Sequence, residues 1–170
     1  GVRVVPAPCL GRCEQAPVAM VGQRPISCAT PEAVQAAAAS GDTRDLPGDY
    51  IDYAGYVAQG GYRVLRECAS GQRDVESVLK AMEDSGLRGL GGAGFPAGRK
   101  WRAVRAEPAP RLMAVNVDEG EPGTFKDRYY LERDPHRHLE GLLIAAWAVE
   151  AQAVYIYLRD EYHGCRAILQ

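Results

Sequence analysis

The sequence lacks the features of a membrane, secreted or nucleic-acid-binding protein. In its 170 residues no apolar run approaches the roughly 20 residues that a membrane-spanning helix needs. It does not begin with Met, and no secretory leader opens it. Its formal charge of −2 gives no bulk attraction to phosphate backbones. We therefore expect an interior piece of a longer cytoplasmic protein, with no transmembrane segment and no nucleic-acid partner.

Cysteine is scarce. An odd number, scattered along a chain without a leader, fits a reducing compartment better than a disulfide framework. Only Cys9 and Cys13 lie close enough in sequence to share a ligand. For the other three, burial as small apolar side chains is the favoured interpretation; these are Cys28, Cys68 and Cys165.

Apolar residues are plentiful enough for a globular core, at 46% hydrophobic against 25% charged. Helical patterns alternate with apolar runs of strand length, which predicts an α/β fold. Residues 41–61 have no helical periodicity and are predicted to form a linker. Strands are predicted at 2–5, 18–21, 112–117 (a buried strand) and 153–158. Helices are predicted at 31–39, 62–67, 74–85, 96–106, 124–133, 138–150 and after 158.

A glycine-rich stretch occupies residues 86–98. It contains a G-x-G-x-x-G pattern, but the dinucleotide fingerprint needs a preceding strand, and here a helix precedes it. Glycines still let a ligand approach the backbone, and Pro96 opens a helix whose free N–H groups favour an anion. With Lys100 one turn into that helix, the stretch predicts a phosphate site. The alternative is a tight helix-to-helix connection. The pattern glycines are Gly89, Gly91 and Gly94.

An acidic loop follows the strand predicted at 112–117. The carboxylates of Asp118, Glu119 and Glu121 lie where α/β sheets usually bind ligands, at the end of a strand. They suit ring N–H groups and hydroxyls, and they suit phosphate poorly unless a metal intervenes. A Mg²⁺ site and a solvated acidic turn are the alternatives. Together the two loops indicate a nucleotide, without saying which one.

Residues 85–101 and 115–128 resemble the two signatures of the FMN- and NADH-binding flavoprotein subunit. This family occurs in respiratory complex I, NAD-dependent formate dehydrogenases and NAD-reducing hydrogenases. Residues 60–66 also resemble it. The resemblance implies that residues 46–170 are the N-terminal part of an FMN/NADH-binding α/β domain. There NADH gives a hydride to FMN, and the flavin passes single electrons to iron–sulfur clusters.

The resemblance also implies roles for particular residues. It places the nicotinamide nucleotide against the glycine stretch, including Gly94 and Gly98, with Phe95 stacking on a ring. Glu121 would lie near the nicotinamide as the catalytic residue. FMN would contact Gly89, Gly91, Gly92, Lys100, Asn116, Asp118 and Glu119.

Residues 8–21 resemble the second half of a thioredoxin-like [2Fe–2S] domain, which assigns residues 1–45 to such a remnant. Cys9 and Cys13 would supply two of the four thiolates, and the other pair would precede this chain. Fusion of the two domains is typical of the formate dehydrogenase and hydrogenase branches, and we expect the former.

The resemblance further implies partner subunits that carry iron–sulfur clusters, in a multisubunit redox complex. A [4Fe–4S] domain would follow this chain, which we do not expect to be active alone. Two other interpretations stay open: a nucleotide-binding module without redox chemistry, and a Mg²⁺-dependent nucleotide transferase.

Overall fold

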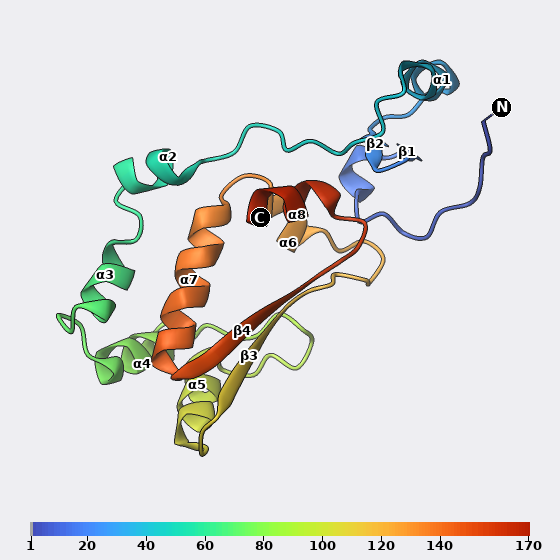
Figure 1. The fold of residues 1–170 in the computed structure, drawn as a ribbon. Helices are drawn as coiled ribbons and strands as arrows, with labels where there is room; N and C mark the ends of the chain where they lie inside the picture. The colour runs from blue at the N-terminus through green and yellow to red at the C-terminus, as the bar shows by residue number, and fades with distance from the viewer. Residues whose placement is uncertain (1) are drawn as a thin grey trace. The chain divides into compact units, whose positions relative to one another are not determined.

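The computed structural model describes residues 2–170, with helices and strands mixed along the chain (Figure 1). The chain divides into two compact units. The first unit comprises residues up to 50, 116–135 and 157–170, and the second comprises 51–115 and 136–156. Each unit is therefore assembled from segments that are separate in sequence. This division into units differs from the domain boundary predicted between residues 45 and 46, and that boundary stays a prediction. No helix in residues 2–170 is long and apolar enough to cross a membrane.

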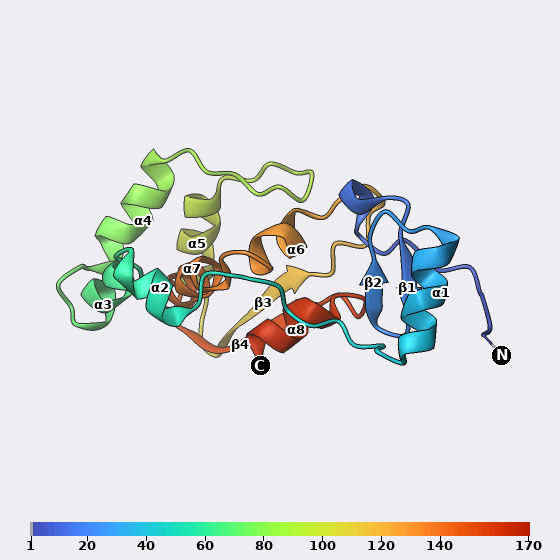
Figure 2. The ribbon, with the colours of Figure 1, turned by 90° about the horizontal axis from the view of Figure 1, so that it is seen from above.

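The first unit begins with a small hairpin and a helix. Strands β1 (Ala19–Val21) and β2 (Arg24–Ile26) pair antiparallel, and α1 (Pro31–Ser40) lies beside them (Figure 2). The hydroxyl of Thr30 caps α1 by accepting a hydrogen bond from the Ala33 N–H at 3.2 Å, as expected for a helix that starts Thr-Pro. The strand predicted at 2–5 is wrong: the segment pairs with no strand among the described residues, and its valines are exposed.

The first unit also has three short helical segments. It contains the short 3₁₀ helix Cys13–Gln15, α6 (Lys126–Leu131) and α8 (His163–Leu169). Leu131, Tyr162 and Cys165 are almost fully buried here. Burial raises the pKa of the Cys165 thiol to about 12. Cys165 and Cys68 are buried, as predicted, whereas the same prediction is wrong for Cys28, which is exposed.

The second unit is built mainly from helices. They are α2 (Tyr53–Ala58), α3 (Arg63–Ala69), α4 (Val75–Asp84), α5 (Ala97–Ala106) and most of α7 (Pro135–Ala148). Cys68, Val78 and Ala148 form its core, with Trp101 and Trp147 packed against them. The predicted helices are confirmed within a few residues, and α2 is an addition. Its six residues are too few to show a period, and it lies inside the predicted linker.

Strands β3 (Arg111–Val117) and β4 (Ala151–Leu158) pair with each other. They run parallel, because their corresponding ends lie together. At one end, the Arg111 side chain at the start of β3 donates to the carbonyl of Val149, just before β4. At the other end, the Arg159 N–H just after β4 donates to the carbonyl of Val117, the last residue of β3. The prediction of a fully buried strand at 112–117 is wrong. Exposure alternates along β3 and Leu112 is 61% exposed, as in a strand covered on one face.

Candidate functional site

The glycine stretch forms a closed loop between α4 and α5. An antiparallel bridge joins Arg88 to Pro96, and the Gly89 N–H donates to the Phe95 carbonyl at 2.9 Å. The Arg88 side chain also donates to the Gly94 carbonyl at 2.9 Å. These bonds close the base of the loop, and residues 90–93 form its tip, which precedes α5.

The backbone at that tip is open. A Cβ atom added at Gly91, Gly92 or Gly94 would meet no heavy atom within 4 Å, so the protein's own packing does not demand glycine there. Gly92 and Gly94 have φ angles of +95° and +59°, which L side chains rarely adopt. Phe95 is 47% exposed and Lys100 is exposed on the first turns of α5. The loop therefore offers open backbone, an aromatic face and a cation to a ligand.

Gly98 differs from the other glycines. A Cβ atom there would lie 2.6 Å from the Glu83 backbone nitrogen and 2.9 Å from the Glu83 Cα, so only glycine lets α5 approach α4 this closely. The contact is between backbones, and real Cβ atoms are not found so near. Gly98 thus has a helix-packing role that does not depend on a ligand.

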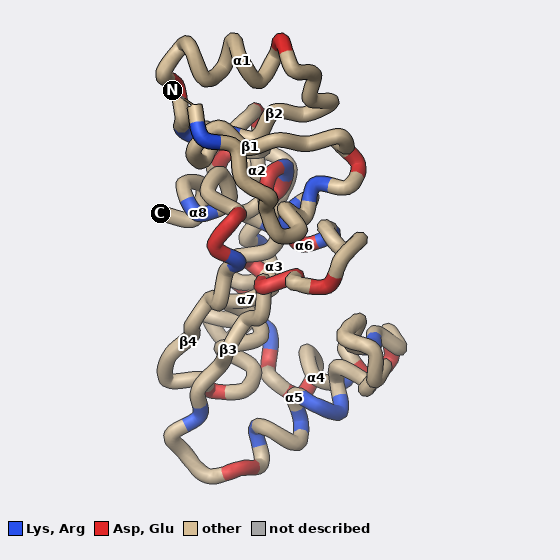
Figure 3. Tube along the Cα trace, turned by 90° about the vertical axis from the view of Figure 1, so that its right-hand side faces the viewer, with Lys and Arg blue, Asp and Glu red and all other residues tan. Residues whose placement is uncertain are grey.

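The acidic loop leaves β3 with a local turn. The Asn116 side-chain oxygen accepts a hydrogen bond from the Asp118 N–H at 3.0 Å. Asp118 is half-buried, while Asn116 and Glu121 are exposed. Figure 3 marks the acidic residues of the chain in red, including those between β3 and α6. Asn116, Asp118 and Glu121 are thus available to hydrogen-bond donors on a ligand.

Glu119 is held inside the protein. Its side chain is 2% exposed. One carboxylate oxygen accepts from the Asp127 N–H at 2.8 Å, and the other accepts from the Arg128 N–H at 3.2 Å and the Tyr162 hydroxyl at 3.1 Å. Its backbone has a φ of +48°, which turns the chain so that the carboxylate points back at α6. The geometry gives Glu119 the task of holding the loop to the N-terminus of α6.

Cys9 and Cys13 lie beside a hollow of about 310 Å³ in the first unit. Cys9 is half-buried and Cys13 is exposed. A hydrogen bond from the Gly11 backbone lowers the pKa of Cys9; burial opposes this, and the Gly123 backbone and Arg159 add to the lowering. No group of three or more His, Cys, Asp or Glu side chains in residues 2–170 is arranged to hold a metal ion. The two thiols therefore form at most part of a metal site.

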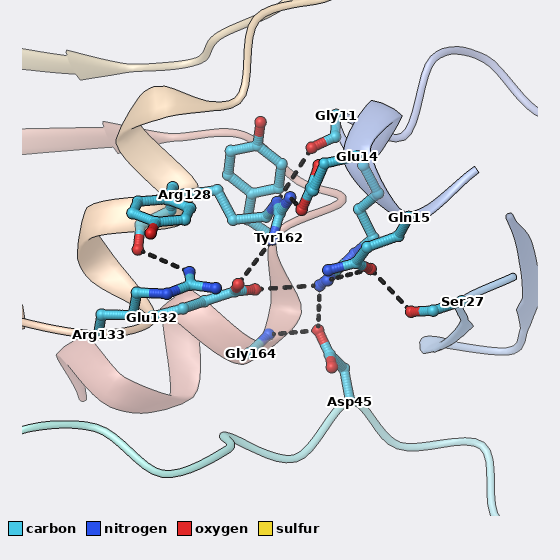
Figure 4. A network of polar contacts seen from close by, with 12 residues as sticks. Gly11, Glu14, Gln15, Ser27, Asp45, Arg128, Glu132, Arg133, Tyr162 and Gly164 are labelled. Atoms are coloured by element: carbon cyan, nitrogen blue, oxygen red, sulfur yellow. Dashed lines mark hydrogen bonds and ion pairs between the residues drawn. The ribbon is translucent and has the colours of Figure 1, made fainter.

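Arg128 joins α6 to the cysteine loop, here defined as residues 9–14. It is fully buried. Its guanidinium donates to the Gly11 carbonyl at 3.0 Å, to Glu132 at 2.6 Å and to Glu14 (Figure 4). Three acceptors around one buried cation satisfy its charge, and they fasten α6 to residues over 110 positions away in sequence.

A second buried arginine extends the network. Arg12, 7% exposed, donates to Asp45 at 3.2 Å and to Glu132 at 3.3 Å. Asp45 in turn accepts from the Gly164 N–H at 2.8 Å, at the start of α8 (Figure 4). The N-terminal segment is therefore tied to both α6 and α8 by charged hydrogen bonds.

The structure thus brings the acidic loop and the cysteine loop together within the first unit, whereas the glycine loop belongs to the second unit. The sequence analysis did not identify three residues that hold the acidic loop and the cysteine loop together. They are Arg128, which is a buried cation, and Arg159 and Tyr162, which follow β4. The only signal that could have found the last two is their place directly after a strand.

Comparison with known proteins decides the family. The family described as "Nuo51 FMN-binding domain" matches residues 82–170, which is more than half of the chain and includes both loops. This chain belongs to the Nuo51 FMN-binding domain family. The resemblance that the two sequence signatures predicted is confirmed.

Relatives of this Nuo51 domain are components of NADH-dependent oxidoreductases. This chain is 47% identical over 119 residues to a component of the NADH-quinone oxidoreductase of Rhizobium meliloti (strain 1021). The match covers 69% of this chain and 28% of the relative. The chain is 44% identical over 130 residues to "NADH dehydrogenase [ubiquinone] flavoprotein 1, mitochondrial" of Dictyostelium discoideum, covering 74% and 27%. The chain therefore spans under a third of the relatives' length.

Its fold also matches a solved structure. A chain of an NAD⁺-reducing [NiFe]-hydrogenase in the air-oxidized state superposes with a TM-score of 0.73 at 32% identity, over 95% of this chain and 31% of that one. The predicted α/β fold is confirmed by this likeness, which extends over nearly all of the chain.

Proposed function

We propose that this chain is part of the flavoprotein component of a multisubunit NAD(H)-dependent oxidoreductase, in which it binds FMN and NAD(H). The observation that carries the proposal is the open glycine loop. A Cβ atom would meet nothing at Gly91, Gly92 or Gly94; Gly92 and Gly94 favour glycine for their positive φ angles, whereas Gly91 has neither reason, and this chain belongs to a family described as FMN-binding. A flat cofactor that lies on exposed backbone would supply the reason at Gly91 and would use the open backbone of all three.

Each loop, taken by itself, has residues that suit one part of a flavin nucleotide. Lys100 and the N-terminal N–H groups of α5 suit its phosphate, and the open backbone at Gly91 and Gly92 suits the close approach of the cofactor. Gly89, whose N–H donates to the Phe95 carbonyl, would contact the cofactor from the base of the loop. Asn116 and Asp118 accept hydrogen bonds from ring N–H or ribityl groups. Glu119 contributes by fixing the shape of the acidic loop.

The nicotinamide nucleotide would share the glycine loop. The exposed ring of Phe95 offers a stacking surface, with Gly94 beside it, and the exposed carboxylate of Glu121 is the residue that we place at the nicotinamide. Bound FMN would supply the hydride acceptor that also exchanges single electrons. The task of Phe95 would be to orient the nicotinamide nucleotide by stacking on one of its rings.

Cys9 and Cys13 fit half of a [2Fe–2S] site. Their thiols lie at one hollow, and backbone N–H groups favour the thiolate form of Cys9, as a cluster ligand requires. We propose that two thiolates outside this chain complete the site, in a thioredoxin-like domain of which residues 1–45 are a part. A [4Fe–4S] cluster would belong to a separate segment of the same flavoprotein.

Within the family we propose the formate dehydrogenase branch. The support is the presence of the cysteine segment and the flavin segment on one chain. The likeness to the hydrogenase chain extends over 95% of this chain and so includes both segments. Flavoproteins of hydrogenases and of NADH:quinone oxidoreductases are the alternatives.

The test is an anaerobic absorbance titration of the natively purified protein. Addition of NADH should bleach the flavin band and then the broad iron–sulfur absorbance. In the same preparation, formate should reduce both groups when NADH is absent. Reduction by hydrogen gas and not by formate would replace the formate branch with the hydrogenase branch.

Three results would contradict the redox proposal itself. A colourless protein that binds NADH would be a nucleotide-binding module. A colourless protein with Mg²⁺-dependent nucleotide turnover would be a transferase built on the acidic loop. A yellow protein that NADH does not bleach would also count against it.

A further inference from the structure

Arg159 contacts both loops of the first unit at once. Its guanidinium donates to the Cys9 carbonyl and, at 2.8 Å, to the Glu119 carbonyl. A third bond runs to the Glu161 carboxylate at 2.9 Å. The side chain is 8% exposed, so these bonds are shielded from water. Arg159 therefore occupies the boundary between a residue of the cysteine pair and the backbone of the acidic loop.

The sequence separations show why one side chain matters here. Cys9 is 150 positions from Arg159, and Glu119 is 40 positions away. Neither loop is a regular helix or strand at these residues. Loops without a ladder of their own are held by whatever side-chain bonds reach them, and a buried guanidinium that bonds two carbonyls is among the strongest.

We propose that Arg159 is a positioning residue that ties the cysteine loop to the acidic loop and raises the reduction potential of a cluster held at Cys9. The proposal rests on the function proposed above, because it presumes a cluster at the cysteine pair. It adds a residue outside both signatures, and it couples the two loops through one side chain.

The positive charge of Arg159 is the reason for the proposed effect on the reduction potential. A cluster becomes more negative when it accepts an electron, and a nearby cation stabilises that state. Glu161 offsets part of the charge, and the carboxylates of Glu14 and Glu132 bond to Arg128 rather than to Arg159. A guanidinium at the Cys9 backbone therefore makes the cluster easier to reduce.

The experiment compares three variants of the complete native enzyme. Arg159→Gln removes the charge and the fork of donors. Arg159→Lys keeps the charge but reaches only one of the two carbonyls. Arg166→Gln is the matched control, because Arg166 is an exposed arginine on α8. For each we would measure amide hydrogen exchange, and the cluster midpoint potential by mediated titration with electron paramagnetic resonance.

Arg159→Gln should speed exchange about tenfold in peptides that cover both 9–13 and 119–123, as expected for the loss of charged hydrogen bonds. It should also shift the midpoint potential to lower values. Arg159→Lys should loosen one loop and shift the potential less, and Arg166→Gln should change neither. Faster exchange in only one loop with Arg159→Gln, or an unchanged potential, would overturn the proposal.

A Cys9→Ser variant separates this inference from the proposed function. It should abolish the [2Fe–2S] signal and leave reduction of the flavin by NADH intact. If its spectrum equals that of the wild type, the cluster assignment fails and with it the claim about potential. The exchange result with Arg159→Gln still decides whether one arginine couples the loops.

Discussion

At the residue scale, two carboxylates of the acidic loop have different surroundings although they are two positions apart. Glu119 is buried with four hydrogen-bond donors around it, one of them the Lys126 ammonium at 3.4 Å, and Glu121 is exposed. The sequence predicts that both contact a ligand. The structure favours different tasks: Glu119 holds the loop, and Glu121 faces outward, where it can meet a ligand.

Glu119→Gln should loosen the N-terminus of α6. The amide replaces one carboxylate oxygen with an NH₂ group, which must face N–H or O–H donors, and a buried polar group left without a partner costs about 1–3 kcal/mol. Amide exchange of Asp127 and Arg128 should rise accordingly. Glu121→Gln is the control for this measurement. Equal effects of the two substitutions on exchange would contradict the distinction.

Glu121→Gln should instead change the affinity for NAD(H) and spare the FMN content. The reason is its proposed place at the nicotinamide, away from the flavin phosphate and ribityl groups. Equilibrium titration with NAD(H) gives the affinity, and flavin released on denaturation gives the FMN content. A loss of both, or of neither, would argue against this role.

At the element scale, the contact between α4 and α5 sets the base of the glycine loop. Gly98→Ala should lower the free energy of unfolding of the protein by on the order of 1–3 kcal/mol, because the added methyl group meets the Glu83 backbone. Gly141→Ala on α7 is the matched helical control. A Cβ there meets nothing within 4 Å, so it should stabilise by about 0.5–1 kcal/mol. Thermal unfolding of both variants checks the opposite signs.

At the scale of a whole compact unit, Glu140 on α7 anchors the second unit. It accepts from the Tyr56 hydroxyl at 2.6 Å and from the Tyr62 and Leu65 N–H groups at 2.8 and 3.3 Å. Burial alone would raise the pKa of Glu140, but these hydrogen bonds outweigh it and hold the pKa below 4.5. One carboxylate thus joins α7 to α2 and α3.

This anchor predicts an acid-dependent loss of stability. Since the folded pKa of Glu140 lies below its unfolded value, its contribution is present above about pH 4.5 and is lost as pH falls through the folded pKa. Glu140→Gln should be less stable at pH 7 and lose less on acidification, measured by urea unfolding from pH 7 to pH 3. Exposed Glu107→Gln should keep the wild-type pH slope. A wild-type slope in Glu140→Gln would contradict the prediction.

The sequence by itself determined the elements with strong local signals and the family. Thr30 and Pro31 start α1 through a cap that depends on neighbouring residues only, and the two loop signatures consist of contiguous residues. The exposed valines at 2–5 and the short helix α2 were misjudged, because an apolar run does not show what covers it and six residues show no period.

Only the tertiary structure decided what the side chains of the first unit do. Local sequence gives no sign that Arg128 is fully buried, that Glu119 faces inward, or that Arg159 reaches Cys9 across 150 positions. These arrangements depend on which segments pack together, and buried charges persist only where distant segments supply their partners. For that reason the residue types alone predicted the chemistry of the glycine loop and of the acidic loop. They could not predict that the acidic loop and the cysteine loop are joined by hydrogen bonds.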